Sequence, residues 1–339
     1  MKREISIDIL RIVAIALIFC FHFCCTFGFD SNPMYGYANG GWGAVGTTIF
    51  YIISGYTLSM KYKDISGKEN VCNFYRKRFR AMFPSLWLIF LIGYLVNAIS
   101  LAGFEYGGSP IRLIYSILGI DGYVNMLGYP SYYVTGEWYT AVILVIYLIF
   151  PVLAYLFRKC RICMVAAVAV LYTTNIMFWS DRISPDASVI TGVAMFTVGM
   201  LLQHYSDSLR KSLWPVPLCA VIGLVIVFVP LPYYRYQLPY KNLLAVCIFI
   251  LVYILAHTIE SRMGRPDGIV VRLINMFASM TLEIYLLHHF VLRYGYICFG
   301  GSINSMKCVL GFFVITLAIT VIGAYIVHGI FSRKKEPLK

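Results

Sequence analysis

The chain has 339 residues, of which 60% are hydrophobic and only 13% are charged, and its formal net charge is +13. About a quarter of the residues of a soluble domain are charged, so this composition excludes an ordinary soluble globular protein and indicates a polytopic membrane protein. In such a chain the basic residues orient the loops, and no nucleic-acid partner is expected.

Ten apolar segments that are long enough, or nearly long enough, to cross a bilayer follow one another along the chain. They predict an all-α fold: a polytopic membrane helix bundle of about ten transmembrane helices, forming a single membrane-embedded domain over residues 1–339. Two of the segments are short, which leaves nine or eleven spans open. The expected spans are 9–29, 41–61, 83–102, 138–157, 162–180, 187–203, 214–231, 242–257, 276–298 and 309–331.

The basic residues are unevenly divided between the two sets of alternating loops. Most of the 28 Lys and Arg residues lie in loops on the same side as the N-terminus, and the largest group lies between residues 61 and 80. Loops 30–40 and 103–137 carry almost none. The positive-inside rule therefore predicts cytoplasmic termini, with loops 30–40 and 103–137 outside.

The first span carries two ionisable side chains in an otherwise apolar stretch, "DILRIVAIALIFCFHF". Arg11 and His22 lie eleven residues apart, about three helical turns, so they share one face with a rise of about 16 Å between them. Arg11 could simply reach the membrane surface with Asp8 as its partner. His22 lies deeper, where it is either a buried packing residue or a general base in a water-accessible cavity.

The second and third spans add two further patterns. "GGWGAVGTTIFYIISGYTL", which includes Ser54, is rich in small residues that favour either close helix packing or a groove for an elongated ligand. "NFYRKRFRAMFPSLWL" places four basic residues within five positions at the start of the third span. They serve either as a positive-inside cluster or as a clamp for phosphate groups.

The ninth span, within "SMTLEIYLLHHFV", places His288 and His289 at about the depth of His22 and adds Glu283 as an intramembrane carboxylate. The loop 103–137 is rich in tyrosine, which fits an aromatic belt at the interface or stacking on sugar rings. "CRIC" has the spacing of a metal or redox pair, but no second pair lies near it in the sequence, so no metal is expected.

Taken in order, these stretches resemble acyltransferase family 3, the integral-membrane O-acyltransferases that modify cell-surface glycans. Arg11 and His22 match the family's opening motif of Arg, ten residues, then His. "GAVGTTIFYIISGYTL", "RKRFRAMFP", "EWYTAVILVIYLIFP" and "LEIYLLHHF" are similar to its later elements. Two departures are Ala81, where the family often has a second arginine three positions after Arg78, and the absence of acidic residues around Ile143.

The resemblance implies an acyl-CoA donor on the cytoplasmic side, most simply acetyl-CoA, and a hydroxyl acceptor on an extracytoplasmic glycan or lipid-linked sugar. A pantetheine arm has a length comparable to the rise from Arg11 to His22, and His22 would act as general base or be acylated itself. The implied location is a bacterial cytoplasmic membrane. A transporter or flippase of a glycan intermediate is the alternative. The resemblance implies donor contacts from Arg11, Ser54, Arg76, Lys77, Arg78 and Arg80, and acceptor contacts from Glu137, Trp138, Glu283, Tyr285 and His288.

Overall fold

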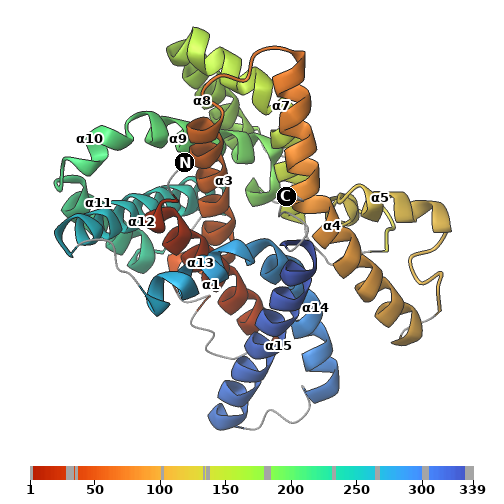
Figure 1. Cartoon of the computed structure of the whole chain (residues 1–339). Helices are drawn as coiled ribbons and strands as arrows, with labels where there is room; N and C mark the ends of the chain where they lie inside the picture. The colour runs from red at the N-terminus through yellow and green to blue at the C-terminus, as the bar shows by residue number, and fades with distance from the viewer. Residues whose placement is uncertain are drawn as a thin grey trace. The chain divides into compact units, whose positions relative to one another are not determined.

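The structure is a computed structural model of the chain, and helices account for almost all of its regular elements (Figure 1). It describes residues 3–27, 34, 37–100, 103–132, 134, 138–178, 185–230, 234–263, 268–299 and 305–332, and none of these lies in a strand. The longer helices are α1 (Ile5–Phe27), α3 (Trp42–Lys61), α4 (Lys68–Ser100), α7 (Trp138–Lys159), α8 (Arg161–Met177), α9 (Val189–His204), α11 (Pro215–Phe228), α12 (Tyr234–Met263), α13 (Ile269–Ser279), α14 (Thr281–Phe299) and α15 (Met306–Ser332). The short ones are η1 (Ala38–Gly40), η2 (Pro110–Arg112), α5 (Leu113–Ile117), α6 (Asp121–Met126), η3 (Pro185–Ala187) and α10 (Ser206–Arg210).

Five of the described helices are long and apolar enough to cross a membrane, namely α1, α4, α7, α12 and α15. The pair α13 and α14, interrupted at Met280, adds a sixth if it counts as one broken span. Helices α8, α9 and α11 are apolar but shorter, at 10–17 residues. The all-helical, membrane-spanning character of the prediction is confirmed, whereas its count of ten spans and its placement of the termini are not.

The residues group into two compact units. Unit 1 comprises residues 1–21, 29–71 and 146–279, and unit 2 comprises residues 22–28, 72–145 and 280–339. Helices α1, α4 and α7 contribute residues to both units.

Unit 1 contains very close backbone contacts between α3 and α9, which are neighbours in space although far apart in sequence (Figure 1). A Cβ added at Gly55 would lie 1.9 Å from the carbonyl oxygen of Phe196, and one at Gly199 would lie 2.1 Å from that of Ile52. Only glycine allows two backbones to approach this closely. These two positions therefore fix where α3 and α9 cross.

The same helix α3 packs against α1 through other small residues. A Cβ at Gly43 would meet the ring of Phe21 at 2.5 Å, and one at Gly46 would meet the carbonyl oxygen of Ala14 at 2.7 Å. Of the two interpretations of the small-residue pattern, close helix packing is confirmed at these positions.

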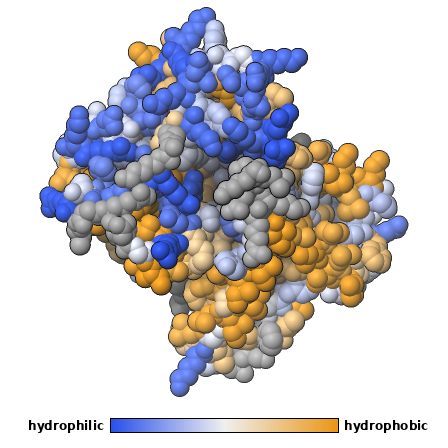
Figure 2. Space-filling view, in the orientation of Figure 1, coloured by the Kyte–Doolittle hydropathy of each residue, from blue (hydrophilic) through white to orange (hydrophobic). Residues whose placement is uncertain are grey.

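Unit 2 is built around α14 and α15, together with the last turns of α1. Phe23 and Phe27 of α1 contact Phe313 and Phe312 of α15, with ring centroids 5.1 and 5.9 Å apart. Figure 2 shows hydrophobic side chains over α14 and α15, in agreement with a lipid-facing surface, whereas hydrophilic side chains gather over unit 1 around α8 and α10. This packing positions the last turns of α1 against α14.

Candidate active site

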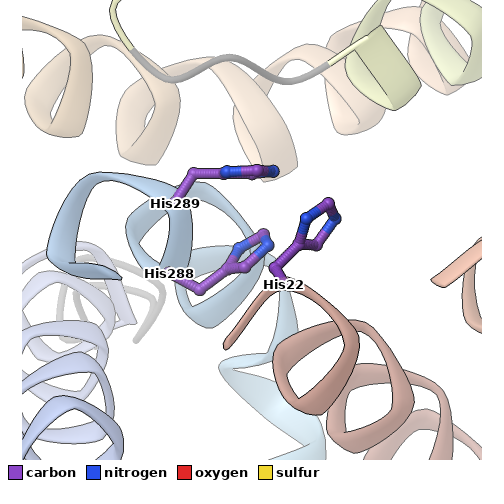
Figure 3. Close-up of side chains that lie close together, drawn as sticks. All are labelled: His22, His288 and His289. Atoms are coloured by element: carbon purple, nitrogen blue, oxygen red, sulfur yellow. The ribbon is translucent and has the colours of Figure 1, made fainter. Parts of the chain in front are cut away.

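Three imidazole rings meet in unit 2 where the end of α1 adjoins α14 (Figure 3). The ring centroid of His22 lies 4.0 Å from that of His289 and 5.1 Å from that of His288. The rings of His288 and His289 are 4.6 Å apart. We call this group the histidine cluster; it brings together the histidines that the sequence placed at one depth on two different spans.

Helical spacing explains how α14 supplies its half of the cluster. Tyr285, His288 and His289 lie at positions i, i+3 and i+4, so they share one face of the helix. Glu283 lies five residues before His288, about 140° further around the helix, and therefore faces elsewhere. On α1, His22 belongs to the penultimate turn, where the hydroxyl of Thr26 donates to its carbonyl oxygen at 2.8 Å.

His288 is completely buried, and its Nδ1 lies 2.5 Å from the carbonyl oxygen of Tyr285. A carbonyl oxygen only accepts hydrogen bonds, so Nδ1 carries the proton, and the neutral ring keeps its lone pair on Nε2. The ring of Tyr285 contacts His288 at 5.5 Å and Tyr139 at 5.3 Å, and Tyr139 in turn lies 6.5 Å from Trp138. Trp138, Tyr285 and His288, all expected near the acceptor, thus form one continuous wall.

Glu283 has different neighbours from the histidine cluster. It is 4% exposed, accepts a hydrogen bond of 2.8 Å from the hydroxyl of Ser85, and lies 3.3 Å from Nδ1 of His328. These contacts tie α4, α14 and α15 together within unit 2. The structure therefore gives Glu283 a role in joining helices, and its predicted contact with the acceptor stays a prediction.

The histidine cluster is also the one group among the described residues whose donor atoms lie close enough together to suggest a metal ligand set, all within 4.8 Å of one another. Zinc binds nitrogen at about 2.0–2.1 Å, which places the ligand nitrogens of a tetrahedral site about 3.3 Å apart. The donor atoms would have to approach one another by up to about 1.5 Å to hold such an ion. Three imidazoles are a chemically suitable set for a transition metal, although no metal was expected from the sequence.

Arg11 lies in unit 1 and shares a buried carboxylate with a second arginine. Its Nη1 is 2.8 Å from Oδ1 of Asp8, and Arg3 also pairs with Asp8, whose side chain is only 1% exposed. The predicted partnership of Arg11 with Asp8 is confirmed. Because one carboxylate faces two guanidinium groups, the group of Arg3, Asp8 and Arg11 carries one net positive charge.

The other expected donor contacts lie on two helices. Ser54 is half-buried on α3. On α4, Arg76, Lys77 and Arg80 are exposed and Arg78 is half-buried, with its guanidinium 6.0 Å from the ring of Phe74. Their predicted donor roles stay predictions. Glu137, expected near the acceptor, lies outside the described residues.

Sequence reasoning missed a polar network within unit 1. The guanidinium of Arg210 pairs with Glu4 at 2.8 Å and donates to the hydroxyl of Tyr253 at 2.7 Å. That hydroxyl lies 2.8 Å from the hydroxyl of Tyr56. Glu4 and Arg210 are 206 positions apart, so no local pattern could have paired them; the signal available was Tyr56, a polar tip within the Ser-Gly-Tyr element.

Comparisons with known proteins agree with these observations. The acyltransferase family 3 model, described as an acyltransferase domain, matches residues 4–329, nearly the whole chain. A curated relative, acyltransferase MdmB of Streptomyces mycarofaciens, is 21% identical over 293 residues, which cover 78% of this chain and 72% of that protein. No solved structure matches the chain significantly. The match over almost the full length, together with the apolar helices and the Arg11–His22 spacing, shows that the chain belongs to acyltransferase family 3.

Proposed function

We propose that this membrane acyltransferase moves an acyl group, most simply acetyl, from acyl-CoA on the cytoplasmic side to a hydroxyl of an extracytoplasmic glycan or lipid-linked sugar. The observation that carries the proposal is the histidine cluster, in which His22 meets two imidazoles and an aromatic wall from a second span. An imidazole with access to a hydroxyl is the commonest general base in enzymes, and the half-buried His22 can meet one.

In the proposed reaction His22 removes the proton of the acceptor hydroxyl while the hydroxyl oxygen attacks the thioester carbonyl carbon. The tetrahedral intermediate then collapses, the carbon–sulfur bond breaks, and the proton passes from His22 to the departing CoA thiolate. The products are an ester and free CoA, so atoms and charge balance without an external oxidant or metal. This route needs only one residue to hold a proton between the two steps.

The neighbouring residues have supporting roles in this proposal. The side chain of His288 is oriented by the Tyr285 carbonyl, so it supports the position of His22 or accepts a hydrogen bond from the acceptor. Tyr285 and Trp138 supply aromatic surface of the kind that stacks on sugar rings. Arg11, on the same face of α1 and about 16 Å along the helix, lies at a distance that suits the far end of a pantetheine arm.

Comparison of surface glycans tests the proposal directly. Mass spectrometry of glycans and lipid-linked sugars from cells with and without the gene should reveal ester-linked acyl groups that depend on the protein, and the purified protein should release free CoA from acetyl-CoA when the acceptor is added. A transporter would change the amount or location of a glycan without adding an acyl mass. That result would contradict the proposal.

A further inference from the structure

A cavity of about 360 Å³ lies within unit 1, and none of its lining residues belongs to the histidine cluster. It is formed at the C-terminal ends of α3, α7 and α9 and at the start of α8. Small-molecule sites typically have volumes of about 300–1,000 Å³. This cavity is at the lower end of that range, which suits one part of a large ligand better than the whole of it.

The lining of the cavity is basic. Lys63, Arg158 and Arg161 contribute positive charges and His204 adds an imidazole, against the single carboxylate of Asp207. The Asp207 side chain is 87% exposed and lies 3.9 Å from Arg210, so it is turned largely toward solvent. An excess of cationic groups around a concave volume favours an anionic ligand.

Arg161 is the cation most firmly held in place. Its Nη1 lies 2.6 Å from Nε2 of His204, and its guanidinium lies 5.0 Å from the ring of Phe157. Its Nε is buried, as is the hydroxyl of Ser59, and within the described part of the chain neither atom has a hydrogen-bond partner. A buried donor that lacks an acceptor is costly, and a phosphate oxygen in the cavity would supply one.

Arg158 can bind a phosphate group in the cavity if it gives up its present partner, Asp64. It pairs with Asp64 at 2.5 Å, and the two side chains are 39% and 68% exposed. Hydrogen bonds from Ser66 and Arg158 hold the pKa of Asp64 below its usual range. Exposed ion pairs contribute little to stability, so Arg158 can leave Asp64 for a phosphate group at little cost.

We propose that this cavity binds the phosphate-bearing nucleotide end of the acyl-CoA donor, with the phosphates on Arg161, Arg158 and Lys63. The inference rests on the proposed acyl transfer and deepens it, because it assigns the donor's nucleotide to named residues. Arginine suits phosphate because its guanidinium forms paired, charge-assisted hydrogen bonds. Tyr62 and Phe157, which also line the cavity, offer aromatic surface to the base.

The assignment differs from the one that the sequence suggests. The sequence predicts the phosphate contacts at residues 76–80 of α4, where Arg76, Lys77 and Arg80 are exposed side chains. The cavity residues instead gather cations from separate segments of the chain around one volume. Both groups include a buried guanidinium nitrogen, Nε of Arg161 in the cavity and Nε of Arg78 on α4. Cations that line one concave volume can contact the same phosphate together, so the cavity is the better nucleotide site.

The binding test uses the full-length protein in phosphatidylcholine nanodiscs, with adenosine 3′,5′-bisphosphate as the probe in isothermal titration calorimetry. Arg161→Gln should weaken binding by about tenfold or more, because a charge-assisted contact is lost. The matched control is Lys159→Gln, which removes the same charge two residues earlier, at the end of α7. Lys159 is exposed, its ammonium lies 5.6 Å from the ring centroid of Tyr155, and it does not line the cavity. Asp207→Asn should tighten binding, since it removes the one carboxylate that lines the cavity.

Equal binding by the wild type, Arg161→Gln and Lys159→Gln, or no binding at all, would overturn the assignment. A thermal melt of each variant separates lost binding from lost folding, and the tighter binding expected of Asp207→Asn cannot come from unfolding. A parallel measurement in phosphatidylglycerol nanodiscs tests the other source of phosphate. If phosphatidylglycerol abolishes nucleotide binding in the wild type, the cavity is a lipid headgroup site and the proposal is wrong.

Turnover measurements separate this inference from the proposed function. His22→Ala should still bind the nucleotide probe, because the chemistry and the nucleotide contact use different residues. If the wild type binds the probe through Arg161 but never turns over acyl-CoA, the cavity assignment stands and acyl transfer fails. If it turns over acyl-CoA while Arg161→Gln leaves the KM for acyl-CoA unchanged, the cavity assignment alone fails.

Discussion

His22 and His288 are close neighbours in different surroundings. His288 is completely buried and its Nδ1 is engaged by the Tyr285 carbonyl, whereas His22 is only half-buried. A general base has to meet its substrate and exchange a proton, so partial exposure suits His22 for that task. A fixed, buried ring suits His288 as a residue that positions its neighbour.

At this scale the first prediction concerns these two histidines. His22→Ala should lower the rate of acyl transfer by about 100-fold or more, because a general base contributes 10²–10⁴-fold to the chemical step. Binding of acyl-CoA and the amount of protein in the membrane should stay close to wild type. His288→Ala should lose only part of the activity. Activity is measured for all variants as the amount of acyl ester on surface glycans per unit of membrane protein.

Two controls give that comparison its meaning. Folding of each variant is checked by thermal unfolding in detergent, so that a misfolded protein is not mistaken for an inactive one. Near-normal turnover by well-folded His22→Ala would show that His22 is a packing residue. Complete loss in His288→Ala with activity retained in His22→Ala would exchange their roles.

At the scale of elements, the crossing of α3 and α9 depends on two glycines. Gly199→Ala should destabilise the protein by at least about 1–3 kcal/mol, the usual cost of overpacking, because its Cβ would lie 2.1 Å from the Ile52 carbonyl oxygen. The matched control is Gly223→Ala on α11, where the nearest atom lies 3.7 Å away. The thermal unfolding temperature in detergent should fall for the first variant and stay unchanged for the second. Equal temperatures for both would mean that the helices shift apart without cost.

The histidine cluster, formed by two helices, leads to a prediction about metal ions. Added Zn²⁺ should inhibit acyl transfer, because coordination uses the imidazole lone pair that a general base needs, and a chelator should restore activity. His289→Ala removes one ligand and should weaken the inhibition more than it slows the uninhibited reaction. Activation by Zn²⁺ with loss of activity in the chelator would instead make the cluster a metal centre.

The sequence predicted part of this arrangement for clear physical reasons. Apolar segments and the spacing of Arg11 and His22 are local patterns, and both appear in the structure. The approach of His22 to His289 and the pairing of Glu283 with Ser85 and His328 depend on how distant helices pack. The depth of the side chains along their spans predicts that His22 and His289 lie at the same level in the membrane, but not that they touch. No local sequence pattern predicts the partners of Glu283.

The small-residue pattern of α3 illustrates the same limit. The pattern predicts close packing but not the partner, because any neighbouring backbone could use the glycines. In the structure Gly46 faces α1 as a sequence neighbour would, whereas Gly55 faces α9, which lies more than 130 residues later. The basic cavity was not predicted from the sequence for the same reason: its lining residues come from separate segments between residues 59 and 207.

At the scale of the whole molecule, the distribution of charge predicts the orientation in the membrane. In a variant without its ten native cysteines, Ser109→Cys should react with a membrane-impermeant maleimide in intact cells, because loop 103–137 is expected outside. Ser66→Cys should react only after the membrane is permeabilised. Both side chains are exposed, so each is open to the reagent on its own side. The opposite labelling pattern would invert the orientation and place the basic cavity outside the cell.

With the donor bound in the basic cavity as proposed, the glycine crossing of α3 and α9 would also link the supply of the donor to the lifetime of the protein. Ser59 and Gln203, which line the basic cavity, each follow one turn after Gly55 and Gly199. A ligand bound there holds the ends of both helices just beyond their contact, and a ligand that binds only the folded state stabilises it, by about 2.7 kcal/mol at a hundredfold excess over its dissociation constant. Cells rich in acyl-CoA would therefore retain more of the folded enzyme, whereas starved cells would lose it to membrane proteases.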